Sequence, residues 1–139
     1  MKNTLTIVLC SVGILAFGCS QSHKPDSLTL QGTWSGQQVG HEKQGAHSLV
    51  LDGTKFEYHG ARPDDWEKAT FSLREDTTPK QLDAVVTDCP ATDYVGKTIH
   101  MIYKMDDGKL TLAANKPGNL EAPTSFDTNS ARIFVFTKK

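Results

Sequence analysis

Residues 48–59 read SLVLDGTKFEYH, and apolar and polar side chains alternate on both sides of a tight turn in this stretch. Two leucines share one face of the first segment, and Phe56 and Tyr58 share one face of the second. Alternation with a period of two is typical of a half-buried β-strand. Asp-Gly between two such runs is a strong signal for a hairpin. The stretch therefore predicts two antiparallel strands joined by a turn at Asp52-Gly53.

The same alternation recurs along the rest of the chain. A second Asp-Gly turn is expected at Asp107-Gly108, and a long polar stretch occupies residues 115–130. An opening strand from Leu30 to about Val39 and a final strand from Ala131 to Thr137 bring the predicted strands to eight. Between them, the predicted inward-facing positions are Phe71, Leu73, Leu82, Ala84, Val86, Ile99, Met101, Tyr103, Met105, Leu110 and Leu112.

Short strands joined mostly by tight turns predict an antiparallel up-and-down order. A flat sheet of this kind would expose two edges and one large apolar face. Closure removes both, and a barrel of about eight strands has an interior that side chains fill or that holds one small ligand. The sequence therefore predicts an all-β fold, an eight-stranded antiparallel up-and-down barrel. A two-sheet sandwich is the alternative.

The motif Gly32-Thr33-Trp34 lies on the first predicted strand. A glycine in a strand permits a bend and a close backbone approach, and an arginine over an indole face contributes roughly 0.5–2 kcal/mol. Gly-x-Trp combined with an arginine in the last strand, here Arg132, resembles the signature of lipocalins and their calycin relatives. The resemblance implies that Trp34 plugs the closed end of a barrel and that Arg132 packs across it.

A longer set of segments resembles a family of small bacterial lipocalin-like domains, known mainly from planctomycete-type genomes. The matching segments are LQGTW (30–34), LVLDGTKFEYHG (49–60), PKQLDAVVTDCP (79–90), GKTIHMIYKMDDGKLTLA (96–113), PTSF (123–126) and IFVF (133–136). The resemblance covers residues 28–137 and implies a fold without a reaction, because that family has no established function. The sequence departs from the family at His100-Met101 and at residues 113–115, so a relative's ligand transfers poorly.

The first twenty residues, MKNTLTIVLCSVGILAFGCS, have the order of a secretory signal: one charged residue, an apolar run, then small residues. The run from Leu5 to Phe17 is too short to cross a bilayer, which needs roughly 20 residues. Residues 15–19, Leu-Ala-Phe-Gly-Cys, resemble the lipobox of bacterial lipoproteins, in which the chain is cut before an acylated cysteine. The alternative is an ordinary signal with an incidental cysteine.

The lipobox resemblance implies a signal peptide over residues 1–18, a lipidated tether over 19–28 and the barrel domain over 29–139. Acyl chains such as palmitate on Cys19 would anchor the domain to the membrane of the cell envelope, because each buried methylene contributes about 0.8 kcal/mol. Ser20 favours the outer membrane over the inner membrane, since an aspartate in its place often signals inner-membrane retention.

The composition excludes several classes of protein. The formal net charge is −1, from 15 basic and 16 acidic residues, so no surface for nucleic acid is indicated. Cleavage before Cys19 would leave Cys89 as the single free thiol of the domain, so no internal disulfide is available. Cys89 stands in Asp88-Cys89-Pro90, a sequence typical of a loop, and no basic residue stands beside it to activate the thiol.

Motifs of catalysis and metal binding are scarce. No serine stands in a Gly-x-Ser-x-Gly setting, and neither a His-Glu-x-x-His helix nor a glycine-rich phosphate loop is present. His41, His47 and His59 lie near the open end of the predicted hairpin, but alternation places His47 and His59 on opposite faces. Asp64-Asp65 is predicted to be a solvated pair. We therefore predict a protein that is not an enzyme, with no cofactor and no metal site.

The inward-facing side chains are the best candidates for a binding site. Aromatic and methionine side chains suit a pocket for a hydrophobic or amphipathic molecule, since methionine adapts to ligand shape and tyrosine offers a hydroxyl. The alternative is that the same residues fill a packed core. The candidate pocket residues are Phe56, Tyr58, Phe71, Met101 and Tyr103.

These patterns together predict a membrane-anchored lipoprotein whose barrel binds a small apolar ligand in the cell envelope. The alternative is a packed, non-catalytic barrel that binds an envelope protein through its surface, as a scaffold or an inhibitor. The candidate surfaces are residues 60–67 and 115–130. Trp66 would be the anchor, because tryptophans are common hot spots of interfaces.

Overall fold

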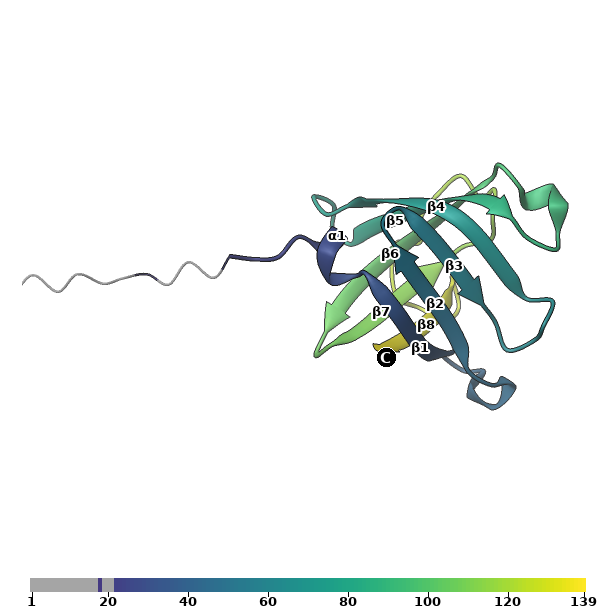
Figure 1. The fold of residues 1–139 in the computed structure, drawn as a ribbon, viewed down its shortest axis with the longest axis horizontal. Helices are drawn as coiled ribbons and strands as arrows, with labels where there is room; N and C mark the ends of the chain where they lie inside the picture. Colours follow the sequence, from purple (N-terminus) through teal and green to yellow (C-terminus); the bar gives the residue numbers. More distant parts are fainter. Residues whose placement is uncertain (1–17, 19–21) are drawn as a thin grey trace, which may run out of the picture.

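The structure, a computed structural model, describes Gly18 and residues 22–139. The predicted lipidation site Cys19 therefore lies outside the described residues. The strands form one closed ring in the order β1 to β8, in which each strand is antiparallel to its neighbours and β8 returns to β1 (Figure 1). This is the predicted all-β, eight-stranded, up-and-down barrel, consistent with a lipocalin-like fold. The closed ring rules out the sandwich.

The strands follow the predicted segments closely. Their bounds are β1 (Gly32–Gln38), β2 (His47–Asp52), β3 (Lys55–His59), β4 (Trp66–Arg74), β5 (Lys80–Asp88), β6 (Thr98–Asp106), β7 (Lys109–Ala114) and β8 (Arg132–Lys138). Three short helical turns accompany them: α1 (Asp26–Thr29), η1 (Glu42–Gln44) and η2 (Thr92–Tyr94). None of the helices in the described part of the chain has the length and apolar character needed to span a membrane.

Both predicted hairpins form. In the first, Asp52 pairs with Lys55, which leaves Gly53-Thr54 as the turn, one residue later than predicted. In the second, Asp107-Gly108 is the turn as predicted, with φ angles of 50° and 72°. Positive φ at both central residues matches the right-handed twist of the flanking strands. The alternation of apolar and polar residues therefore predicted both strand pairs correctly. The exact position of the first turn depends on the register between β2 and β3, which the alternation did not give.

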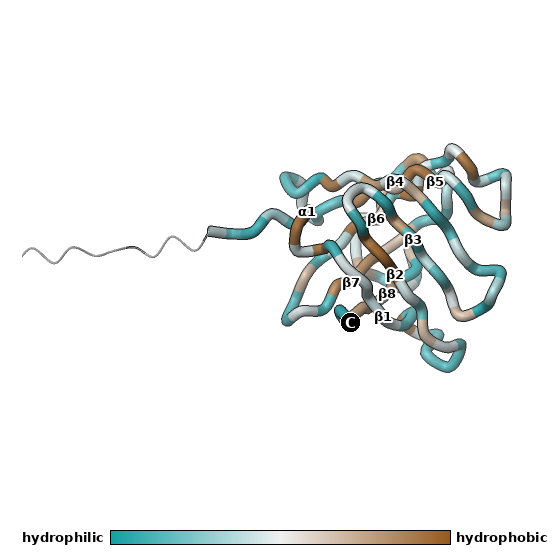
Figure 2. Tube along the Cα trace, viewed as in Figure 1, coloured by the Kyte–Doolittle hydropathy of each residue, from teal (hydrophilic) through white to brown (hydrophobic). Residues whose placement is uncertain are grey.

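The alternating inward side chains form one continuous core. All the predicted inward positions are buried except Leu73 and Met105, which are partly buried. Figure 2 shows apolar and polar residues following one another along the strands. Burial of a large apolar side chain stabilises a fold by roughly 1.5–3 kcal/mol. Cys89 is a free thiol and forms no disulfide. The described barrel is therefore stabilised by its apolar core without a covalent cross-link.

A second, smaller apolar cluster lies on the outer face of β6, β7 and β8. Its buried members are Ile102, Ala113 and Ile133, and the side chains packed over them are Ala122, Phe126 and Ala131. Lys104 also covers this segment, with its Nζ 4.9 Å from the centroid of the Phe126 ring. Residues 115–131 thus pack against the barrel wall. Most side chains of this segment, such as Leu120 at 90% exposure, remain exposed, and the interaction surface stays a prediction.

The two ends of the barrel differ. Short turns and α1 gather at one end, here called the closed end (Figure 1). The longer connections gather at the opposite end, here called the mouth, and they are residues 39–46, 60–65, 89–97 and 115–131. Because loops commonly carry function on a rigid scaffold, the mouth is the first place to search for a site.

Helix α1 belongs to the folded domain, although residues 26–28 were predicted to lie in the tether. The buried Asp26 carboxylate accepts hydrogen bonds from Lys80 Nζ at 2.6 Å and from Tyr103 Oη at 2.8 Å. Burial raises the pKa of Asp26, but these hydrogen bonds and the Lys80 charge outweigh it, so the pKa lies below its ordinary value. The folded domain therefore begins at Asp26 and not at residue 29.

Candidate functional site

Trp34 closes the end of the barrel that α1 covers. It is buried, and its indole Nε1 donates a hydrogen bond to the carbonyl oxygen of Leu30 at 2.9 Å. Gly32 has a φ of 124°, and a Cβ there would lie 2.9 Å from Lys138 Cε. Lys138 itself covers the indole, with its Nζ 5.2 Å from the ring centroid. Gly32 thus gives the close approach that this plug requires.

Arg132 does not pack across Trp34, so that prediction is wrong. Trp34 pairs with Lys138 at the far end of β8, whereas Arg132 begins β8 at the mouth. At about 3.3 Å per residue, the two basic residues are separated by about 20 Å along the strand. The pattern of the last strand did not show which basic residue reaches the indole, because both share one face of the strand.

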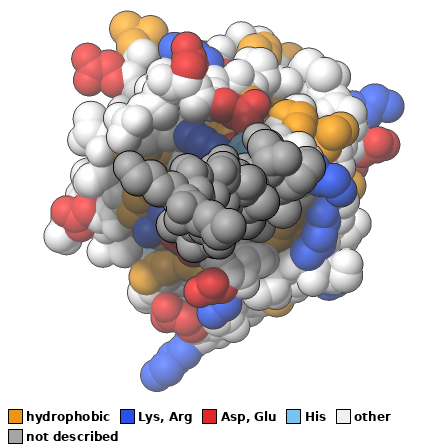
Figure 3. Space-filling model, turned by 90° about the vertical axis from the view of Figure 1, so that its left-hand side faces the viewer, with side chains coloured by type: hydrophobic (Ala, Val, Ile, Leu, Met, Phe, Trp, Pro, Cys, Tyr) orange, Lys and Arg blue, Asp and Glu red, His pale blue; other side chains and the backbone are white. Residues whose placement is uncertain are grey.

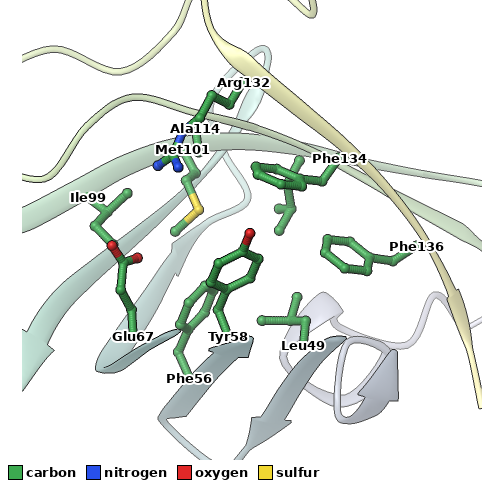
Figure 4. Close-up of a pocket in the computed structure, with 11 residues that line it drawn as sticks. Leu49, Phe56, Tyr58, Glu67, Ile99, Met101, Ala114, Arg132, Phe134 and Phe136 are labelled. Atoms are coloured by element: carbon green, nitrogen blue, oxygen red, sulfur yellow. The ribbon is translucent and has the colours of Figure 1, made fainter. Parts of the chain in front are cut away.

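The barrel interior holds a small cavity toward the mouth. Its volume is about 30 Å³, room for a water molecule or two, whereas sites for drug-sized ligands measure roughly 300–1,000 Å³. Figure 4 shows the Tyr58 hydroxyl and the Met101 thioether reaching into it. The apolar and aromatic lining residues are Leu49, Phe56, Tyr58, Ile99, Met101, Leu112, Ala114, Phe134 and Phe136.

Three of the five predicted pocket residues line this cavity, namely Phe56, Tyr58 and Met101. Phe71 is buried in the core but does not line the cavity. Tyr103 points to the closed end, where its hydroxyl donates to Asp26. Alternation assigned all five side chains to the correct face. It did not give their depth along the barrel axis, which decides whether they reach the cavity.

Two charged residues that sequence reasoning missed also line the cavity: Glu67 from β4 and Arg132 from β8. Figure 4 shows both side chains extending toward it from opposite sides. The alternation could have predicted the position of Glu67, because this residue shares the inward face of Ala69 and Phe71. Burial raises the pKa of the Glu67 carboxyl, and the nearby Asp65 adds to the rise while the Arg132 charge opposes it. Asp65 is therefore part of the mouth and not a purely solvated acid.

His47, the first residue of β2, lies buried at the mouth. Its Nδ1 is 2.7 Å from Tyr58 Oη, while its Nε2 is buried without a hydrogen-bond partner. Burial lowers the pKa of the imidazole and, as the main cause, raises the pKa of the Tyr58 hydroxyl, so both groups are neutral near neutral pH. His59 is exposed and bonded to Glu57, so the two histidines point to opposite faces as predicted.

The Nε of Arg132 is the second buried side-chain atom at the mouth with no hydrogen-bond partner. Both it and His47 border the Phe134 ring. The ring centroids of His47 and Phe134 are 5.5 Å apart, and Arg132 Cζ lies 5.9 Å from the centroid of Phe134. A buried polar atom without a hydrogen-bond partner destabilises the folded protein. His47 Nε2 and Arg132 Nε are therefore two atoms at the mouth that a bound molecule could satisfy.

Two larger, open grooves meet the cavity at Arg132. One, of about 480 Å³, runs between residues 64–67 and 89–94, and the other, of about 420 Å³, runs along residues 114–119 and 128–133. Arg132 lines both grooves and the cavity. This side chain is therefore the point at which the interior and the outer surface of the mouth join.

Trp66 and Cys89 lie in the larger of these grooves. Trp66 is half-buried, with Lys68 Nζ 5.8 Å from its ring centroid. Cys89 is buried in the loop after β5, and its Sγ donates to the carbonyl oxygen of Ala91 at 3.0 Å. Burial raises the pKa of this thiol, so the reactive thiolate is disfavoured. Cys89 is thus a loop cysteine without an activating group.

Within the described part of the chain, no group of three or more His, Cys, Asp or Glu side chains is placed to hold a metal ion. Comparisons of the chain with protein-family models, with curated proteins and with solved structures found no match.

Proposed function

We propose that this domain binds a small hydrophobic or amphipathic molecule at the mouth of its barrel, and that a lipid on Cys19 holds the domain to the cell envelope. The observation that carries the binding proposal is the cavity. It has apolar walls, and Arg132 in its lining has a buried Nε without a partner. His47, whose buried Nε2 also lacks a partner, borders Phe134 of the same lining. Apolar walls with a few convergent polar groups are the usual composition of a ligand site.

The size of the cavity limits the ligand. A volume of about 30 Å³ admits only the end of an apolar chain. Met101 borders this space, and methionine side chains rearrange readily around a ligand. The grooves outside the rim give room for the remainder of the molecule. A narrow, small ligand fits this arrangement better than a bulky ring system.

Binding is tested by isothermal titration calorimetry with octanol, a neutral and narrow molecule with one apolar chain. We expect the wild-type domain to bind it and Ala114→Phe to weaken binding at least about tenfold, which is 1.4 kcal/mol. Ala114 lines the cavity and is 6% exposed, so phenylalanine there fills the space. The control is Val85→Phe, an outward-facing position at 43% exposure. Absent binding by the wild type, or equal binding by both variants, contradicts the proposal.

The lipid anchor is supported by the lipobox resemblance and is compatible with the described fold. The chain leaves α1 on the side opposite the mouth (Figure 1), so an anchor there leaves the mouth open to the envelope space. The face around this exit carries basic and acidic side chains intermixed (Figure 3). We expect wild-type protein in the membrane fraction with an acylated Cys19, and Cys19→Ala lacking the acyl mass. An unmodified mature protein that begins elsewhere contradicts this anchor.

A second candidate function is that of a scaffold or inhibitor for another envelope protein, and the small size of the cavity favours it. In that case the groove beside the half-buried Trp66 is the binding surface. Octanol then fails to bind the wild type, whereas a protein retained from the envelope fraction is lost with Trp66→Ala. Retention that is unchanged in Trp66→Ala contradicts this second function.

A further inference from the structure

Arg132 differs from Arg62 and Arg74, the other two arginines of the chain. Arg74 pairs with Asp83 at 2.6 Å, and Arg62 pairs with Asp64 at 3.7 Å. The ion pairs of the described residues include none for Arg132, and its buried Nε has no hydrogen-bond partner. A buried donor without an acceptor destabilises the protein, and more so when the group is charged. A ligand that brings an acceptor to Arg132 removes this cost.

A second unsatisfied atom is His47 Nε2, and its side chain borders the same Phe134 ring as Arg132 does. His47 and Arg132 come from β2 and β8, the two strands that flank β1, and both border Phe134. Because the Tyr58 hydroxyl keeps its proton, it can donate to His47 Nδ1. In that tautomer His47 Nε2 carries a proton and is a donor, as Arg132 Nε is. Two donors without acceptors then border the ring of Phe134, which lines the apolar cavity.

The surroundings favour an acceptor with a single negative charge. The guanidinium fork matches the two oxygens of a carboxylate. Glu67 and Asp65 lie near enough to act on the charges at the mouth. A group with two negative charges is repelled more strongly by these carboxyls than a group with one. The apolar walls behind Arg132 suit the hydrocarbon part of the same molecule.

We propose that the ligand is a small amphipathic acid, whose carboxylate binds Arg132 and His47 and whose apolar chain enters the cavity. This inference rests on the binding function proposed above and names its chemical class.

The test compares the affinities of octanoate, octanol and octyl phosphate for the domain, measured by isothermal titration calorimetry at pH 8. Hydrogen bonds to charged groups are stronger than those between neutral groups, so we expect octanoate to bind the wild type at least about tenfold more tightly than octanol. In Arg132→Met this preference disappears. Arg62→Met is the matched control, because it removes an exposed arginine of the same end of the barrel and should keep the preference.

A second variant moves the affinity in the opposite direction. Glu67→Gln removes a negative charge from the lining of the cavity, so octanoate should bind several-fold more tightly to it than to the wild type. The ratio of octanoate affinity to octanol affinity should therefore rise. A general disturbance of the fold by either substitution would alter the affinities for both molecules together, and thermal unfolding of each variant checks the fold directly.

The outcomes separate this inference from the function on which it rests. Equal affinities for octanoate and octanol in the wild type, or a preference that survives in Arg132→Met, overturn the acid site while the binding function stands. Tighter binding of octyl phosphate than of octanoate overturns the choice of a singly charged carboxylate. Failure of all three molecules to bind the wild type overturns both proposals.

Discussion

Asp26 is the residue through which the N-terminal helix joins the barrel. Its carboxylate lies among Lys80, Tyr103 and the end of the core, and its amide donates to Glu75 Oε1 at 2.8 Å. Removing one partner of a buried hydrogen-bonded charge leaves the other partners unsatisfied. The stability of the closed end therefore depends on the ionised form of one carboxyl group.

We predict that the free energy of unfolding decreases in acid because of Asp26. Its pKa in the folded protein lies below the ordinary value of 3.8, so the unfolded chain binds more protons there. The stabilisation is complete above the ordinary value and is lost as the pH falls through the folded-state pKa. Asp26→Asn should cost about 1–3 kcal/mol at neutral pH and flatten this acid dependence. Urea unfolding across the acid range measures both effects.

The control for this prediction is Asp106→Asn, since the Asp106 side chain is 71% exposed and only 3.9 Å from Lys104. That variant should keep the acid dependence of the wild type. An acid dependence that persists unchanged in Asp26→Asn contradicts the assignment.

Glu67 titrates with the opposite sign. Burial raises its pKa, so the folded protein holds this proton to higher pH than the unfolded chain does. The contribution of Glu67 to stability is therefore largest below its ordinary pKa and decreases as the pH rises through the raised value. We predict that Glu67→Gln removes this decrease and is more stable than the wild type in mild alkali. Thermal unfolding at several pH values measures the stability of both proteins. A Glu67→Gln variant that is less stable than the wild type at every pH contradicts this prediction.

At the scale of elements, the seam between β1 and β8 depends on Gly36. A Cβ at this position would overlap the carbonyl oxygen of Val135 and press on Phe136. We predict that Gly36→Ala lowers the free energy of unfolding by about 1–3 kcal/mol, because backbone atoms of a closed sheet cannot move aside freely. Ser35→Ala, at the neighbouring outward-facing position, is the control. Equal stability of the two variants in urea would mean that the seam tolerates a side chain.

The segment 115–131 is a second element whose role depends on packing. Phe126 covers the outer apolar cluster, whereas Leu120 in the same segment is 90% exposed. We predict that Phe126→Ala costs about 1–2 kcal/mol, less than a fully buried phenylalanine, and that Leu120→Ala changes stability by less than about 0.5 kcal/mol. Hydrogen exchange of residues 115–131 should accelerate in Phe126→Ala alone. Unchanged exchange there would show that the segment does not depend on this contact.

At the scale of the whole molecule, periodicity predicted the barrel because a strand pattern assigns each side chain to one face. The eight strands, the turn at Asp107-Gly108 and the buried face of each strand could all be predicted from this alternation. The axial position of each residue does not, because it depends on register and tilt across neighbouring strands. For that reason the sequence placed Tyr103 in the pocket and Arg132 over Trp34, and missed Glu67 as a residue of the mouth. The packing of residues 115–131 was also missed, since their polar composition is typical of a free loop.

The difference between the two ends leads to a prediction about orientation on a membrane. If Cys19 carries a lipid, at most about 25 Å of extended chain separates it from α1, so the closed end is held near the bilayer and the mouth lies farther out. A fluorophore attached through Asp76→Cys at the closed end should be quenched by headgroup nitroxide lipids more strongly than one attached through Asn129→Cys at the mouth. Both variants carry Cys89→Ser, which removes the free thiol of the described chain. Because the proposed ligand site opens at the mouth, equal quenching at both positions would mean that the membrane does not orient this site toward the envelope space.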